Sequence, residues 1–204
     1  LFAGIGGIRK GFELACAARG ITTECVFTSE IKEHAIKVLH QNHPEDIITG
    51  DITQVNPCDI PDFDVLLGGF PCQAFSSAGR RLGFEPLGFV LENVEGLVNH
   101  DKANSKDAIG NTLRTILNTL QEIGYQTSWR VLYASKFGVP QERKRVYIVG
   151  TKTTSPDLDN FPEVTKTLSS ILETGLPTKD TKFTRSVLKH YRIEEVFGKA
   201  FKDK

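Results

Sequence analysis

The chain has 204 residues, enough for one domain of ordinary or slightly large size. Apolar residues make up 39% of it and charged residues 25%, so it can bury a core and is not expected to be disordered throughout. Lysine plus arginine and aspartate plus glutamate each number 25, so the net charge gives no general sign of nucleic-acid binding.

Strand-length apolar runs alternate with helix-length amphipathic stretches, which is the pattern of a parallel α/β sheet. The helices are expected at residues 8–19, 31–42 and 108–123. The strands are expected at residues 1–2, 24–29, 46–49, 63–67, 88–94, 125–134 and 145–150.

The pattern weakens after residue 151, where only two short helices are expected, at 168–172 and 186–191. We therefore expect one domain over residues 1–152, followed by a linker and the start of another element over 153–204. The stretch 179–204 carries eight lysines and arginines against four acidic residues. The chain begins at Leu1 without an initiator methionine, as a fragment of a longer chain would.

The apolar runs and the cysteines exclude further classes of protein. No apolar run approaches the ~18 residues that a membrane helix needs, and no signal peptide opens the chain. The four cysteines (Cys16, Cys25, Cys58 and Cys72) form no C-x-x-C pair, which argues against a metal site and a disulfide scaffold and fits the cytoplasm. All except Cys72 are expected to be inert packing residues.

A glycine turn, Phe2-Ala3-Gly4-Ile5-Gly6-Gly7, joins the first strand to the first helix. Glycine lets a ligand approach the backbone, and a helix N-terminus offers N–H groups to it. Glu30 follows the second strand, where a carboxylate can accept from ribose hydroxyls. Asp51 follows the third and could accept from an amine, although capping a helix is the plainer interpretation. Taken together, these residues favour a nucleotide-like cofactor.

Two reactive groups follow the next two strands. Cys72 lies in Gly68-Gly69-Phe70-Pro71-Cys72-Gln73, where a partly exposed thiol can act as a nucleophile. Glu92 ends the apolar stretch 88–91, where a desolvated carboxyl group could donate a proton. Such a pair could attack an aromatic ring and protonate it.

Residues 141–145 read Gln-Glu-Arg-Lys-Arg and follow Gly138-Val139-Pro140. In an extended segment, alternation would put Gln141, Arg143 and Arg145 on one face. Arginine forks suit phosphate or carbonyl oxygens, although a solvated edge strand is the plainer interpretation.

In this order, FAGIGG, the Glu30 region, GDI at 50–52, GGFPCQAFS, LENV and QERKR resemble the DNA (cytosine-5) methyltransferases of the bacterial restriction-modification type. The resemblance covers residues 1 to about 150. It implies the doubly wound α/β fold of the S-adenosylmethionine-dependent methyltransferases, with a mostly parallel sheet, helices on both faces and the last strand antiparallel. It also implies a cytoplasmic bacterial monomer that acts on double-stranded DNA without a metal or a membrane, with a separate cognate endonuclease as a partner.

The resemblance assigns roles to individual residues. Cys72 should add to C6 of a flipped cytosine, Glu92 should hydrogen-bond its N3 and amino group, and Arg145 should contact its O2 side. Arg143 and Gln141 should order the loop. The residues implied for S-adenosylmethionine are Phe2, Gly4, Gly6, Gly7, Glu30, Ile31, Asp51, Ile52 and Pro71. The residues implied for DNA are Gln73, Ser76, Arg80 and Arg81.

The chain also departs from the family pattern. Only 20 positions separate Cys72 from Glu92, where the family has a longer stretch, so Glu85-Pro86 is expected to be a junction across an absent segment. The target-recognition domain and the last two family motifs are absent as well. Two other interpretations remain: a tRNA cytosine-5 methyltransferase, and a catalytically silent DNA-binding module on the same fold.

Overall fold

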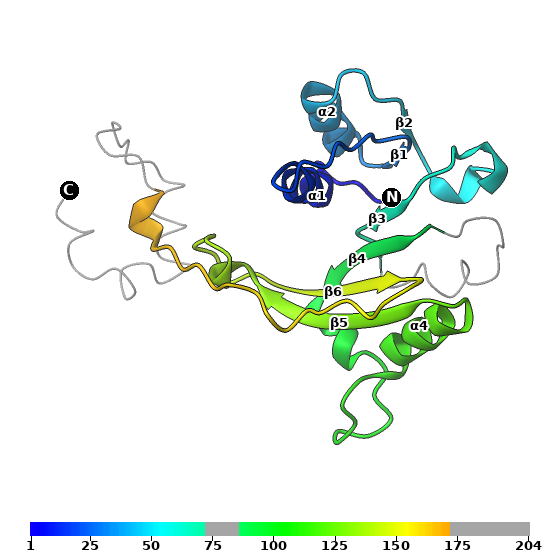
Figure 1. Cartoon of the computed structure of the whole chain (residues 1–204). Helices are drawn as coiled ribbons and strands as arrows, with labels where there is room; N and C mark the ends of the chain where they lie inside the picture. The colour runs from blue at the N-terminus through cyan, green and yellow to red at the C-terminus, as the bar shows by residue number, and fades with distance from the viewer. Residues whose placement is uncertain (72–85, 172–204) are drawn as a thin grey trace, which may run out of the picture. The chain divides into compact units, whose positions relative to one another are not determined.

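The computed structural model describes residues 1–71 and 86–171 (Figure 1). The chain divides into two compact units, Leu1–Lys166 and Thr167–Lys204. Among its described residues, the first unit has helices α1 (Gly7–Ala17), α2 (Glu33–Asn42) and α4 (Asn111–Glu122). Its strands are β1 (Thr28–Ser29), β2 (Ile48–Thr49), β3 (Val65–Gly68), β4 (Gly88–Val94), β5 (Gln126–Tyr133) and β6 (Lys144–Thr151).

The strands form a parallel pair, β1-β2, and a four-stranded sheet in the order β3-β4-β6-β5. β3 and β4 are parallel, whereas β6 runs antiparallel to both of its neighbours. The sheet is therefore mixed, with the last strand antiparallel, as the resemblance implies.

Residues 1–3 lie between the two sheets and join them. The Leu1 amino group donates to the Leu67 carbonyl at 2.7 Å, and the Gly69 N–H donates to the Leu1 carbonyl at 3.3 Å. On the other side, the Ala3 N–H donates to the Ser29 carbonyl at 3.1 Å. The strand order changes direction between residues 1–3 and β3, and ligands of open α/β sheets bind at such a point, beyond the carboxyl ends of the strands.

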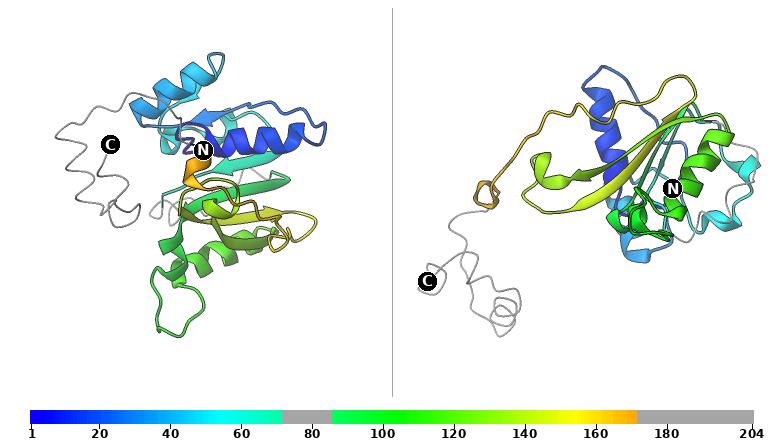
Figure 2. Two further views of the ribbon diagram at one scale, coloured as in Figure 1. Left: turned by 90° about the vertical axis from the view of Figure 1, so that its left-hand side faces the viewer. Right: turned by 90° about the horizontal axis from the view of Figure 1, so that it is seen from below.

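Helices cover opposite sides of the strands. In the right-hand view of Figure 2, α1 and α4 lie on either side of them. The connection through α1 runs from residues 1–3 toward β1, whereas the connection through α4 runs from β4 toward β5, in the opposite direction across the strands. If both crossovers are right-handed, the two helices must lie on opposite faces. The largest buried cluster fills the space between α4 and the sheet; it includes Phe89, Leu91, Leu113, Ile116, Val146 and Ile148.

Helices α1, α2 and α4 and strands β3 to β6 lie where apolar periodicity predicts them, and β4 has the predicted bounds. The predicted strand over 1–2 is wrong, since residues 1–3 form backbone hydrogen bonds on both sides but are not assigned as a strand. The predicted strand over 24–29 is wrong in length, since only Thr28–Ser29 pairs with β2. α2 begins two residues later than predicted, because the Glu30 side chain accepts the N–H groups of Ile31 and Lys32.

The first compact unit runs to Lys166, and residues 153–164 contact β5 and the turn that follows it. Arg130 pairs with Asp159 at 2.6 Å, and Lys136 pairs with Glu163 at 2.7 Å. The second unit has a short 3-10 helix, Leu168–Ser170, within the range 168–172 predicted for a short helix, and the helix predicted at 186–191 lies outside the described residues. Along the described ranges, no helix is both long enough and apolar enough to cross a membrane.

Candidate active site

The glycine turn lies at the carboxyl end of residues 1–3. Gly4 and Gly6 have φ angles of 55° and 89°, in the left-handed region that favours glycine. The Gly6 N–H donates to the Ala3 carbonyl at 2.9 Å, and Gly6 then caps α1. A Cβ atom on Gly4 would meet nothing within 4 Å, so the outer side of this turn is open to a ligand. Phe2, just before the turn, also has a positive φ angle, of 52°, which is strained for a bulky residue.

Glu30 ties the glycine turn to the end of β1. Its Oε2 atom accepts the Gly4 N–H at 2.7 Å, and its Oε1 atom accepts the N–H groups of Ile31 and Lys32, each at 2.9 Å. Burial acts to raise the pKa of Glu30, which is 7% exposed, but the bonds from Lys32, Gly4 and Ile31 outweigh it and hold that pKa below its ordinary value. The side chain therefore stays ionised next to the turn.

The other cofactor residues predicted nearby have looser surroundings. Asp51 is exposed and caps the 3-10 helix Ile52–Gln54, with its Oδ1 atom accepting the Thr53 N–H at 2.9 Å and hydroxyl at 2.8 Å. These bonds lower the pKa of Asp51. Ile31 is 65% exposed, whereas Ile52 is half-buried. Asp51 thus has the capping role that its sequence position also suggested.

Glu92 and Arg145 meet at the carboxyl end of β4. The Arg145 Nε atom lies 2.9 Å from the Glu92 Oε1 atom, and both side chains are largely shielded from solvent. A Cβ atom built on Gly69 would lie 3.6 Å from the Glu92 Oε2 atom. The structure therefore brings two predicted catalytic residues together, directly beside the glycines that precede Pro71 and Cys72.

The segment that contains Gln141 and Arg143 is not the extended strand predicted for it. The Gln141 N–H donates to the Val139 carbonyl at 2.7 Å, and the Arg143 N–H donates to the Gln141 carbonyl at 2.9 Å. These bonds bend the chain tightly, so β6 begins only at Lys144 and the predicted alternation over 141–145 is wrong. Residues 141–145 and 94–96 nevertheless line one polar cavity of about 490 Å³.

Two residues of this region were missed by sequence reasoning. Tyr147 lies directly opposite Glu92 in the β4–β6 register. Burial raises the pKa of Tyr147, and the Glu92 charge raises it further against the opposing charges of Arg143 and Arg145. Asn93 is buried and binds the Phe70 carbonyl. Its place beside Glu92, within the ENV motif, was the one available signal.

A second cavity, of about 730 Å³, lies between α1 and segments 21–28 and 62–68. Phe2 and Gly6 line it, but Glu30 and Pro71 do not. The cavity thus gathers only part of the predicted cofactor site. Among the described residues, no group of three or more histidine, cysteine, aspartate or glutamate side chains is placed to hold a metal ion.

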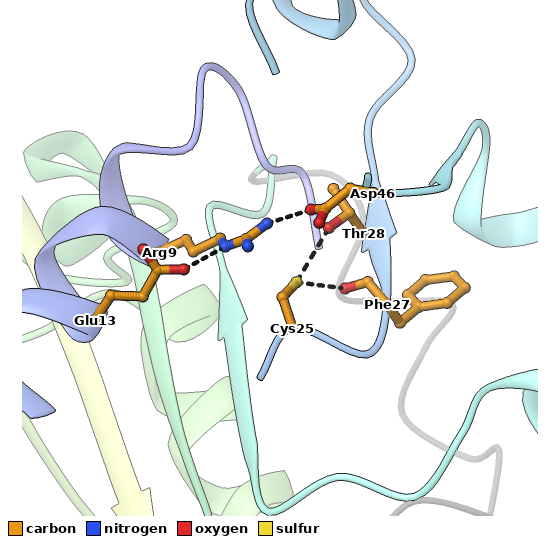
Figure 3. Close-up of polar contacts among 6 residues, drawn as sticks. All are labelled: Arg9, Glu13, Cys25, Phe27, Thr28 and Asp46. Carbon is orange, nitrogen blue, oxygen red and sulfur yellow. Dashed lines mark hydrogen bonds and ion pairs between the residues drawn. The ribbon is translucent and has the colours of Figure 1, made fainter. Parts of the chain in front are cut away.

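A cluster of polar contacts beside this cavity connects α1 to the segment before β2 (Figure 3). It consists of Arg9, Glu13, Cys25, Phe27, Thr28 and Asp46. Arg9 binds Glu13 at 2.6 Å and also binds Asp46. Nearby, the Cys25 Sγ atom lies 3.3 Å from the Thr28 hydroxyl. Cys25 is exposed, and so is Cys58, so the prediction that they are packing residues is wrong for both.

The predicted nucleophile, Cys72, lies outside the described residues, and so do the residues predicted to contact DNA, which are Gln73, Ser76, Arg80 and Arg81. The junction predicted at Glu85-Pro86 also falls at the edge of that range. The assignments of these residues therefore stay predictions.

A family model described as C-5 cytosine-specific DNA methylase matches residues 1–86 and 84–202. Among curated proteins, the chain is 50% identical to Type II methyltransferase M.NgoBV of Neisseria gonorrhoeae and to Type II methyltransferase M.NlaIV of Neisseria lactamica. Both alignments run over 222 residues and cover 100% of this chain and 52% of the relative. The chain therefore spans about half the length of these relatives.

Solved structures show the same fold. The chain is 21% identical to a Spodoptera frugiperda DNMT2 mutant, with a TM-score of 0.63 over 86% of this chain and 59% of that one. It is 26% identical to a putative DNA modification methyltransferase encoded in an Escherichia coli prophage, with a TM-score of 0.54 over 74% of this chain and 45% of that one.

Proposed function

Because the chain belongs to the C-5 cytosine-specific DNA methylase family, we propose that the protein methylates C5 of a cytosine in double-stranded DNA at a short specific site. The methyl donor is S-adenosylmethionine, and Cys72 forms a covalent bond to C6 of a cytosine flipped out of the duplex. The observation that carries this proposal is the ion pair of Glu92 and Arg145, 2.9 Å apart beside Gly69.

The glycine turn and Glu30 fit the proposed cofactor. The turn lies at the N-terminus of an 11-residue helix, with open space beside Gly4. Glu30 is held ionised next to it and uses three of roughly four acceptor positions of a carboxylate on backbone N–H groups. One position is left for a ribose hydroxyl. When bound, S-adenosylmethionine supplies an electrophilic methyl group.

The chain's own residues prepare the cytosine ring for that methyl group. The Cys72 thiolate adds to C6, and the electron pair of the C5=C6 bond shifts toward C5 and into the ring. Glu92 donates a hydrogen bond or proton at N3 and accepts from the amino group, which offsets the charge in the ring. Arg145 holds Glu92 in place and directs its guanidinium toward O2. C5 can then attack.

The reaction ends by restoring the ring. After C5 has gained the methyl group, a base removes the C5 proton, the electron pair re-forms the C5=C6 bond, and the Cys72 sulfur leaves C6. N3 gives its proton back to Glu92 when C5 attacks, so Glu92 and Cys72 both return to their starting states. None of the residues above is assigned as that base.

We also propose that residues 1–152 are the cofactor-binding and catalytic domain, and that 153–204 are a linker and the start of a target-recognition domain. A family segment is absent near residues 85–86. Two observations support this proposal. The family model matches in two pieces that meet at 84–86, and the alignment with M.NgoBV runs over 222 positions although this chain has 204 residues, so it must contain gaps in this chain. The gene sequence on both sides of codons 85 and 86 tests it, since an intact reading frame carrying the longer stretch would contradict a true deletion.

Bisulfite sequencing tests the reaction. A plasmid is recovered from cells that express the full-length gene product, beside Cys72→Ala and Cys58→Ala variants. We expect protected cytosines at one recurring short motif in the wild type and in Cys58→Ala, and none in Cys72→Ala. If soluble wild-type protein protects no cytosine, DNA methylation is contradicted, and the tRNA methyltransferase and the silent DNA-binding module become the interpretations to test.

A further inference from the structure

Asn93 connects the end of β4 to the segment that follows β3. Its Nδ2 atom donates to the Phe70 carbonyl at 2.8 Å, and its Oδ1 atom accepts the Val94 N–H at 2.8 Å. Asn93 is 5% exposed and Phe70 is 6% exposed. The bond to Phe70 therefore lies out of contact with bulk solvent, where an amide–carbonyl bond is strong and a missing partner is costly.

Packing alone does not call for an amide at this position. Side chains alternate along β4, so Asn93 shares a face with Phe89 and Leu91, which pack into the apolar cluster under α4. An aliphatic residue would fill this place without burying polar atoms. An amide differs from an aliphatic side chain because its N–H donor binds one particular atom, the Phe70 carbonyl oxygen, in the segment that follows β3.

The fixed carbonyl belongs to a segment that matters for the proposed reaction. Phe70 precedes Cys72 by two residues, and Gly69 lies against the carboxylate of Glu92. Asn93 itself directly follows Glu92 in β4. One side chain therefore links the backbone leading to the nucleophile with the backbone that carries the ring-binding carboxylate.

We propose that Asn93 is a positioning residue, which sets the approach of the Cys72 thiolate to C6 by holding the Phe70 carbonyl against β4. This inference rests on the proposed function. Asn93 touches no substrate in this role, so its loss slows formation of the Cys72–C6 bond while cofactor binding continues at the glycine turn.

Asn93→Asp tests the proposal most closely in the full-length gene product. Aspartate has nearly the same shape and keeps an acceptor for Val94, but its ionised form cannot donate to the Phe70 carbonyl. Protonation at low pH restores a donor. Asn93→Ser is a second variant without a buried charge, and Asn118→Asp, on the exposed face of α4, is the matched control.

Two quantities are measured for each variant. The first is the rate at which the covalent complex forms, with S-adenosylmethionine present, on duplex DNA in which 5-fluorocytosine replaces the target cytosine. After methyl transfer that ring has no C5 proton to lose, so the complex persists. The second is the dissociation constant of S-adenosylhomocysteine, determined by calorimetry. The first is measured at pH 8 and pH 6 and expressed relative to wild type at the same pH.

We expect complex formation by Asn93→Asp to fall at least tenfold at pH 8 and to recover several-fold relative to wild type at pH 6. Asn93→Ser should be slow at both pH values, and Asn118→Asp should match wild type. In both Asn93 variants, the dissociation constant should stay within twofold of the wild-type value.

Unchanged complex formation in both Asn93 variants would overturn the inference. So would an equal loss of cofactor binding in Asn93→Ser, because that result indicates a general structural role. If the wild-type protein itself forms no covalent complex, the proposed function is contradicted. If only the Asn93 variants behave as wild type does, the role of Asn93 alone is contradicted.

Discussion

The Glu30 Oε2 atom accepts the Gly4 N–H at 2.7 Å, across 26 positions of the chain. This bond joins the turn that precedes α1 to the end of β1, and the other carboxylate oxygen caps the approach to α2. One side chain thus organises the two loops to which the proposed cofactor site belongs.

Glu30→Ala should weaken cofactor binding by tenfold or more, since it removes the ribose acceptor and releases the Gly4 N–H. Calorimetric titration with S-adenosylhomocysteine measures the effect. Glu33→Ala is the matched control, because Glu33 is exposed in the first turn of α2 and should bind as wild type does. An unchanged dissociation constant in Glu30→Ala would remove the ribose assignment.

Glu30 should also make the protein sensitive to acid. Its folded-state pKa lies below the ordinary carboxyl value, so folding favours the ionised form. The stabilisation is present above about pH 4.3, the usual glutamate pKa, and is lost as the pH falls through the lower folded-state value. In Glu30→Gln, the free energy of unfolding should change less between pH 5 and pH 3 than in wild type. Urea unfolding at each pH measures this difference, and identical slopes would refute it.

Glu92→Gln should slow formation of the covalent complex with 5-fluorocytosine DNA by at least a hundredfold, because the amide offers no acidic proton at N3. Cofactor affinity should stay near normal. Loss of the partly shielded pair with Arg145 should cost only about 1 kcal/mol of stability. Rapid complex formation by a folded Glu92→Gln variant would exclude Glu92 from the addition step.

Arg9→Ala should lower the free energy of unfolding by about 1.5–3 kcal/mol, the usual range for losing hydrogen bonds to charged groups. Arg9 binds both Glu13 and Asp46 with its side chain mostly shielded from solvent. Arg19→Ala removes an exposed arginine that reaches only the Ala15 carbonyl, and its effect should be below about 0.5 kcal/mol. Equal unfolding midpoints in urea for the two variants would show that the cluster in Figure 3 adds no stability.

The sequence by itself determined the positions of the helices and strong strands, the class of sheet and the order of the motifs. β4 matches its predicted bounds, and α1 and α4 fall within their predicted ranges or one residue outside them. These features depend on apolar periodicity and local chain chemistry, which neighbouring residues carry. Short strands were harder to predict, because the length of β1 depends on where β2 pairs with it.

Only the tertiary structure decided which motif residues meet and which atoms they use. Glu92 and Arg145 approach each other because β4 and β6 pair antiparallel in one register, and a shift by one residue would turn one of them to the other face. The Glu30 carboxylate and the Asn93 amide bind backbone atoms 26 and 23 positions away. Such bonds depend on how the strands pack side by side, and no local pattern of residues encodes their partners.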